Sequence, residues 1–151
     1  DLESSFVLEA AVEHWVREGR PVTDLAMPGL GLTCFRRGPL LRLQGAVSAN
    51  FSGNALRAVQ ELDCLVSMQH LNLDDNPLER LWGLENLPNL SELSLRNTCV
   101  KSLRHLSPLA NLPRLVSLDL TGCPIMETTP RSEICSAVPS LRTLNGTHVS
   151  D

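Results

Sequence analysis

The segment MQHLNLDDNPL, residues 68–78, decides the fold of this chain. Its residues follow the frame LxxLxLxxNxL, in which L stands for an apolar side chain and the asparagine in the ninth place is Asn76. The same frame fits residues 46–56, where Asn54 takes the ninth place. It returns at 90–100 with Thr98 and at 115–125 with Cys123, and a degenerate copy runs over 22–32 with Leu30. The chain is therefore an internal repeat.

The repeat length follows from the residue in the fourth place of each copy. These residues are Leu25, Ala49, Leu71, Leu93 and Leu118, so successive steps are 24, 22, 22 and 25 residues. Steps of this size are typical of short strand-and-turn repeats stacked into a solenoid. The alternating residues predict a short strand, and apolar residues at every third place after it predict a tight helical return. We expect an α/β solenoid with a short parallel sheet on its concave face.

Three parts are predicted along the chain. Residues 1–20 form a cap helix, because Leu8, Val12 and Trp15 lie on one helical stripe before Gly19. Residues 21–129 hold five repeats, and residues 130–151 form a C-terminal cap with a last strand near Leu144. Caps are expected because each terminal repeat would otherwise expose one apolar edge. The chain begins with Asp1, so we expect it to be a domain of a longer protein.

The ninth place of the frame needs a polar side chain. The chain turns there on leaving the strand, and its backbone groups have no ladder partner. Asparagine satisfies such groups well, and Thr98 or Cys123 does so in part. Leu30 cannot, so the first repeat is expected to be the irregular one.

Composition and charge indicate which classes of function the chain can have. The chain has 151 residues, 42% of them hydrophobic, and 17 acidic side chains against 13 basic ones give a net charge of −4. That balance argues against direct nucleic-acid binding and favours a basic or weakly charged protein partner. The five cysteines show no metal-ligand spacing, and no segment has the length and apolarity of a membrane span. We expect an intracellular protein, in the cytoplasm or nucleus, that does not bind membranes.

The C-terminal half also carries a family resemblance. The segments LDLTGCPI at 118–125 and VPSLRTLNG at 138–146, with Arg131 and Val149, resemble the C-terminal cap of the short, 22-residue class of leucine-rich repeats typified by a regulator of protein phosphatase one. Pro130 stands where that cap usually has tyrosine, and Asn145 where it usually has aspartate. The resemblance implies a leucine-rich-repeat solenoid.

Families that share such a cap include the acidic leucine-rich nuclear phosphoproteins, the spliceosomal A-prime protein and an axonemal dynein light chain. The segment LRHLSPLANLPRLVSLDL, residues 103–120, looks closest to the nuclear phosphoproteins, although no acidic tail follows in this chain. That resemblance would imply a regulator that binds histones or a phosphatase.

The outward residues of the stacked strands predict the candidate site, since equivalent positions form columns about 4.8 Å apart across the concave face. Their middle is polar and acidic. We expect it to bind a basic helix or loop of a partner protein. The predicted partner-binding residues are His70, Asn72, Asp74, Asp75, Glu92, Ser94, Arg96, Asp119 and Asn145.

An alternative interpretation is that this face is exposed to solvent and binds no partner. Arg96 would then pair with Asp74 on a merely solvated surface, and the columns lack the aromatic anchors that dominate many interfaces. If the acids serve binding, removing the side chain of Asp74 or Glu92 should leave stability nearly unchanged.

Trp82 falls outside the every-third apolar pattern and is predicted to lie exposed on the convex or side surface, as a possible second contact surface or as a cover for its own repeat. Arg36, Arg37 and Arg42 form a basic cluster that suits a solvated loop better than phosphate binding.

No catalytic, metal or cofactor site is predicted. His70, Asp74 and Glu92 lack a ligand motif, and neither Cys123 nor Cys135 has the setting of an activated nucleophile beside His148. We expect a non-enzymatic adaptor, monomeric or part of a hetero-complex. A structural spacer or an oligomerisation domain within a larger protein is the alternative.

Overall fold

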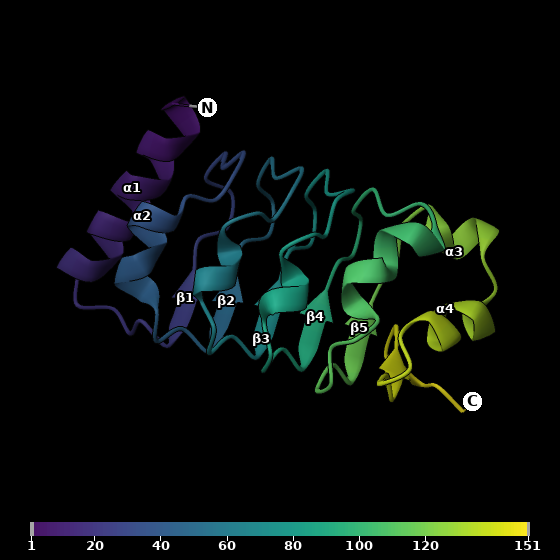
Figure 1. Cartoon of the computed structure of the whole chain (residues 1–151). Helices are drawn as coiled ribbons and strands as arrows, with labels where there is room; N and C mark the ends of the chain where they lie inside the picture. The colour runs from purple at the N-terminus through teal and green to yellow at the C-terminus, as the bar shows by residue number, and fades with distance from the viewer. Residues whose placement is uncertain (1, 151) are drawn as a thin grey trace.

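A computed structural model describes residues 2–150, with side chains from residue 6 onward. Its centre is a seven-stranded sheet in which the strands follow one another in chain order (Figure 1). Strands β1 to β6 pair in parallel, and β7 adds in antiparallel orientation. The strands are β1 Asp24–Ala26, β2 Ser48–Asn50, β3 His70–Asn72, β4 Glu92–Ser94, β5 Ser117–Asp119, β6 Thr143–Leu144 and β7 Thr147–His148.

The register matches the sequence repeat. The fourth-place residues form one row, because Leu25 pairs with Ala49, Ala49 with Leu71, Leu71 with Leu93, and Leu93 with Leu118. All five are buried, and their strand neighbours point outward. The predicted leucine-rich-repeat solenoid of the α/β class is confirmed.

Helical segments cover the opposite side of the solenoid and return the chain to the next strand. Most are 3₁₀ turns, in agreement with the apolar spacing of three. They are α2 Arg37–Leu40, η1 Leu41–Leu43, η2 Leu62–Cys64, η3 Leu84–Asn86 and η4 Leu103–Leu109. Buried leucines such as Leu78, Leu81, Leu84 and Leu87 fill the space between these returns and the sheet. The core is one continuous apolar cluster from Leu8 to Leu144.

A ladder of polar side chains runs inside the turns, as the ninth place predicts. Asn54 accepts hydrogen bonds from the backbone N–H groups of Leu30 and Leu32 and donates to the carbonyls of Met27 and Phe51. Thr98 and Cys123 continue the ladder, since both contact the carbonyl oxygen of Leu95. Asn54 therefore bonds the backbone groups of the first repeat, in which the ninth-place residue, Leu30, is exposed and has no polar side chain to do so.

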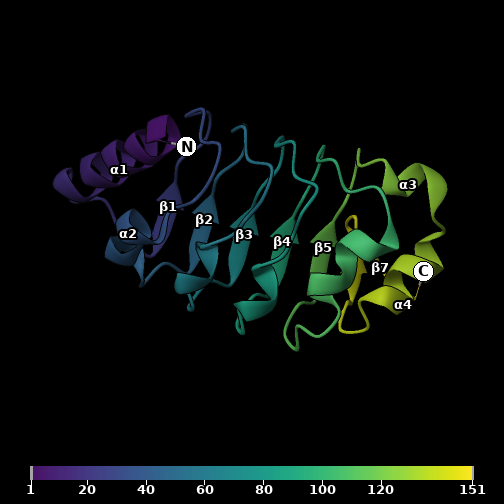
Figure 2. The ribbon, with the colours of Figure 1, turned by 45° about the horizontal axis from the view of Figure 1, so that its top comes forward.

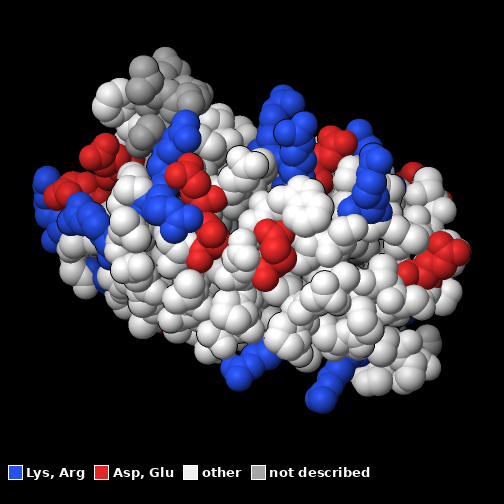
Figure 3. All heavy atoms as spheres, viewed as in Figure 1, with Lys and Arg blue, Asp and Glu red and all other residues white. Residues whose placement is uncertain are grey.

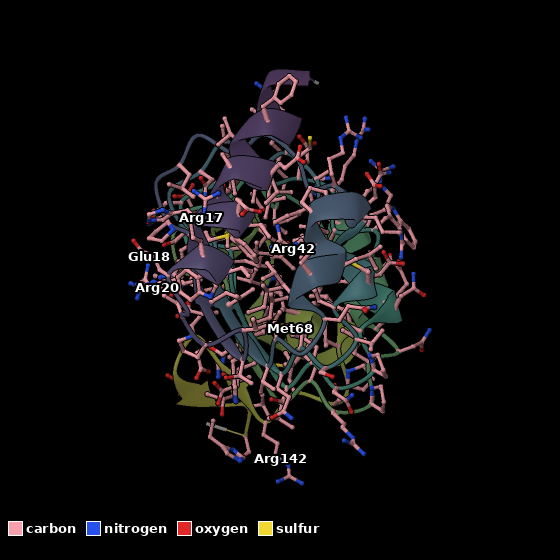
Figure 4. All side chains as sticks on the ribbon, turned by 90° about the vertical axis from the view of Figure 1, so that its left-hand side faces the viewer. Arg17, Glu18, Arg20, Arg42, Met68 and Arg142 are labelled. Carbon is pink, nitrogen blue, oxygen red and sulfur yellow. The ribbon has the colours of Figure 1, made fainter. Side chains whose placement is uncertain are left out.

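The N-terminal helix α1 (Leu2–Arg17) packs across the first repeat and ends three residues before the predicted limit at residue 20. Leu8, Val12 and Trp15 are buried under it, and the indole N–H of Trp15 donates to the carbonyl of Pro21 at 3.1 Å. Arg42 reaches across from η1 to the Glu13 carboxylate of α1 (Figure 4).

The C-terminal cap contains α3 (Ile125–Thr128), α4 (Arg131–Ala137) and the hairpin of β6 and β7 (Figure 2). The guanidinium of Arg131 donates to the carbonyls of Leu144, Thr147 and His148, which ties α4 to both hairpin strands. The expected strand near Leu144 is present. Strand β7 was not expected, and its Thr147 pairs with Leu144 in antiparallel orientation.

Candidate functional site

The concave face is hollowed over its centre. A hollow of about 400 Å³ lies over β2 to β5, and its polar lining includes Ser48, Asn50, His70, Glu92 and Asp119. The predicted residues Asn72 and Ser94 line the same hollow. Ser48, Asn50 and Ser117 line it too and were absent from the predicted set, although their places in the outward columns could have indicated them.

His70 and Glu92 form the first contact across this face. They are paired positions of β3 and β4, and their Nδ1 and Oε2 atoms lie 2.9 Å apart. Both side chains are well exposed, at 45% and 60%. The second carboxylate oxygen of Glu92 makes no hydrogen bond within residues 2–150, so it remains available to an incoming donor.

Asn50, Asn72 and Asp119 occupy equivalent outward positions of β2, β3 and β5, and their side chains stabilise the fold in a way that the sequence pattern did not indicate. The side-chain oxygens of Asn50, Asn72 and Asp119 each accept a 2.9 Å hydrogen bond from the backbone N–H two residues later. Each residue therefore closes an Asx turn at the end of its strand. Asn72 and Asp119 consequently fix the backbone as well as presenting polar atoms.

Asp74 is held more tightly than the sequence suggested. Its Oδ1 accepts hydrogen bonds from the hydroxyl of Ser94 at 2.5 Å and from the backbone N–H of Arg96 at 2.8 Å. The side chain of Arg96 instead approaches Asp119, with 3.9 Å between Nε and Oδ2. The Arg96–Asp74 ion pair, which belonged to the alternative interpretation of a solvated face, is not formed among the described side chains, because Asp74 is turned toward the next strand and accepts from its backbone.

Asp75, Asn97 and Asn145 occupy turns beside the face. All three have a positive φ, at 57°, 57° and 53°, a conformation that aspartate and asparagine tolerate better than most residues. Asp75 accepts a hydrogen bond from the side chain of Asn97. Asn145 is committed to the cap, since its Oδ1 accepts from the backbone N–H of Leu120 at 2.6 Å.

The face as a whole offers acceptors. Four carboxylates lie on it or at its margin, and the one positive side chain among the predicted residues is Arg96, with His70 nearby. The carboxylates are those of Asp74, Asp75, Glu92 and Asp119. Partly exposed carboxylates held on a fixed backbone can accept hydrogen bonds from lysine or arginine at low ordering cost.

The other candidates are placed clearly. Trp82 is 57% exposed, as expected, on the side of the helical returns. The basic cluster is paired, because Arg36 contacts Glu61, Arg37 contacts Asp63, and Arg42 contacts Glu13.

The cysteine and metal-ligand candidates can also be placed in the structure. Cys123 is 2% exposed and lies in the turn ladder. Among the described residues, no group of three or more His, Cys, Asp or Glu side chains is arranged to hold a metal ion. Within the same part of the chain, no helix has both the length and the apolar character needed to cross a bilayer.

Stacked strand-and-turn units, an internal polar ladder and capped ends define a leucine-rich-repeat solenoid, a class of domain that binds other proteins through its extended faces. A family model described as leucine-rich repeat matches residues 44–150, and the chain belongs to this family.

Several proteins resemble the chain in sequence. The geranylgeranyl transferase type-2 α subunit of Sus scrofa is 34% identical over 146 residues, which is 95% of this chain and 25% of that protein. The Homo sapiens protein of the same name is 36% identical over 128 residues, covering 84% of this chain and 22% of its own length. The chain thus spans about a quarter of these relatives. The families with a similar C-terminal cap that were named above do not include these relatives.

Two further matches confirm two of the expected relatives, the nuclear phosphoproteins and the spliceosomal A-prime protein. The acidic leucine-rich nuclear phosphoprotein 32-related protein 1 of Oryza sativa subsp. japonica is 32% identical over 112 residues, covering 70% of this chain and 23% of that protein. Among solved structures, the Drosophila melanogaster SNF/U2A′ complex has a chain that superposes with a TM-score of 0.74 at 25% identity. That match covers 82% of this chain and 72% of the other.

Proposed function

We propose that the concave face binds a basic helix or loop of a partner protein. The observation that carries this proposal is the hollow over β2 to β5, where Glu92 and Asp119 present carboxylate oxygens on neighbouring strands. In the match named above, a protein with this fold forms a complex with another protein, which supports a recognition role.

Fixed geometry supports the same proposal. Asx turns at Asn72 and Asp119 and the double acceptor role of Asp74 hold the strand ends in one conformation. A receptor whose groups are already ordered loses little conformational entropy on binding. In this proposal the domain recognises a partner protein, and no catalytic step is assigned to it.

The face predicts how binding responds to salt. It lacks aromatic side chains, so charge and hydrogen bonds must supply much of the affinity. Because exposed charge pairs are screened by salt, affinity for a basic segment should fall as ionic strength rises.

A second candidate concerns the protein to which the domain belongs. Similarity to geranylgeranyl transferase type-2 α subunits extends over 95% of the chain, while the chain covers a quarter of the relative. We propose that the domain is a non-catalytic recognition module of a related transferase subunit and works inside the cell. Assaying prenyl transfer by the full-length gene product in complex with its partner subunit, with and without residues 1–151, tests this candidate. Absence of prenyl transfer by the full-length product contradicts it.

The concave-face proposal is tested by removing charge while keeping shape. A triple variant, Asp74→Asn, Glu92→Gln and Asp119→Asn, preserves the acceptor oxygens that Asp74 and Asp119 use in the fold. A control variant, Glu9→Gln, Glu127→Gln and Glu133→Gln, removes the same charge from exposed sites elsewhere. Both are compared with the native chain in affinity capture from lysate at about physiological salt, after their melting curves are matched.

We expect a partner that the native chain and the control retain and that the triple variant loses. The captured partner should also dissociate as salt is raised. Equal capture by all three proteins would contradict a role for the acids. If no protein is captured and light scattering shows a stable dimer, the domain is an oligomerisation unit instead.

A further inference from the structure

The side of the solenoid that carries the helical returns has its own exposed aromatic residue. Trp82 lies between the buried residues Leu81 and Leu84, yet more than half of its own surface is open to solvent. The three-residue apolar pattern sends its neighbours into the core and leaves the indole outside. Nothing in the repeat requires tryptophan at this place.

The backbone next to this indole is held closely. Gly83 has a φ of 116°, and a Cβ added there would come within 3.1 Å of the carbonyl oxygen of Val59 in the preceding repeat. Its N–H also donates to the carboxylate of Glu85 at 2.5 Å. The segment after Trp82 is therefore fixed against the neighbouring repeat, and the exposed indole is presented from a defined position.

The indole borders a hollow of about 530 Å³, the Trp82 hollow. Its polar walls are formed by Gln60, Glu79, Arg80, Arg104 and His105. A second depression of about 280 Å³ shares Glu79 and Arg80 with it and adds Arg57. The two depressions together form a basic groove with one aromatic wall.

The positive charge of this groove is only partly neutralised. Among residues 2–150, Arg57, Arg80 and Arg104 form no salt bridge, whereas the arginines of the 36–42 segment are all paired. The one carboxylate in the groove is that of Glu79, which lies 3.7 Å from Nε2 of His105. Figure 3 shows Lys and Arg side chains on this side of the molecule, interspersed with acidic and uncharged ones.

We propose that the Trp82 hollow is a second docking surface, and that its occupant is an acidic peptide segment which packs an apolar side chain against the indole and places carboxylates on Arg80 and Arg104. The combination favours a peptide because tryptophan and arginine are the residue types that most often anchor protein interfaces. A net charge of −4 over the whole chain disfavours a long polyanion, which would also meet the repelling acids.

A defined probe tests the proposal. The probe is a short synthetic peptide of Asp and Glu around one central Phe, labelled with fluorescein, and binding to the 151-residue chain is followed by anisotropy. Peptides in which Lys replaces the acids, or Ser replaces Phe, are compared with it. The test variants are Trp82→Ala and Arg80→Glu. Their controls are Val66→Ala, at an exposed apolar residue, and Arg142→Glu, at an exposed arginine before β6 (Figure 4).

We expect each test variant to bind the Phe peptide at least about tenfold more weakly than the native chain, and each control to bind it as the native chain does. The Lys peptide should not bind this hollow. Unchanged affinity of either test variant would overturn the proposal. So would the absence of peptide binding, including the case in which single-stranded RNA or anionic vesicles bind instead. The concave-face triple variant should bind the peptide normally, which separates the two surfaces.

Discussion

The side-chain oxygen of Asn76 accepts a hydrogen bond from the backbone N–H of Leu56, 3.1 Å away in the preceding repeat. Its amide nitrogen donates to the carbonyl oxygens of Phe51, Leu73 and Asp74. One buried side chain thus satisfies backbone groups of two successive repeats.

Replacing Asn76 by Ala should leave those buried backbone N–H and carbonyl groups without hydrogen-bond partners. The expected loss in the free energy of unfolding is about 2–4 kcal/mol, since each unsatisfied buried group costs about 1–3 kcal/mol and some groups will reach water. Urea unfolding followed by circular dichroism measures it. Asn86→Ala, at an exposed asparagine, is the matched control. Equal midpoints for both variants would contradict the ladder's role.

The contacts of Asp74 change what its truncation should do. Asp74→Ala removes the acceptor for Ser94 and for the backbone of Arg96, so stability should fall by about 1 kcal/mol instead of staying constant. Asp74→Asn keeps that acceptor and should lie closer to the native protein. Thermal melting of the two variants distinguishes the outcomes, and identical curves would show that these hydrogen bonds add nothing.

Gly83→Ala should destabilise the third return. The added methyl group meets the Val59 carbonyl, and a φ of 116° strains any residue with a side chain. We expect a loss of about 1–3 kcal/mol in urea unfolding. Gly38→Ala serves as the control, because an added Cβ there has no heavy atom within 4 Å. Similar stability of the two variants would show that the return adjusts freely.

The link between α1 and η1 should depend on pH. Hydrogen bonds from Arg42, and then from Arg17, hold the pKa of Glu13 below its ordinary value. A depressed pKa in the folded state gives a stabilisation that is present above the unfolded pKa, about 4.3, and lost as pH falls through the folded pKa.

Glu13→Gln should therefore lower the urea midpoint at neutral pH, and the difference from the native chain should shrink as the pH falls below about 4.3 toward the lower pKa of the folded state. Glu9→Gln, at an exposed glutamate of the same helix, should show no such trend. A gap that stays constant with pH would assign the effect of Glu13 to packing.

Local pattern explains what was predictable about the fold. The residues that share the row with Leu71 and Leu93 could be identified because a one-residue slip would move every apolar side chain out of the core. The ninth-place ladder was predictable for a similar reason, since buried backbone groups require polar partners at one defined place.

The side-chain contacts of the candidate site were harder to predict from the sequence. An outward asparagine or aspartate in a strand has the same pattern whether it binds a partner or closes its own turn, as Asn72 and Asp119 do. The choice of Arg96 between Asp74 and Asp119 depends on side-chain rotamers, which periodicity does not specify. Strand β7 did have a signal, because Asn145-Gly146 is the two-residue pair typical of a tight hairpin turn, and both residues have a positive φ.

That hairpin affects more than the length of the sheet. A parallel sheet that ended at β6 would present an unpaired backbone edge, on which another strand can add. Strand β7 covers it with only two residues, Thr147 and His148, running in the opposite direction. Little free backbone remains at this end for pairing with an extended peptide or with a second copy of the chain. The edge that this hairpin leaves open is only two residues long, which limits the addition of a further strand there.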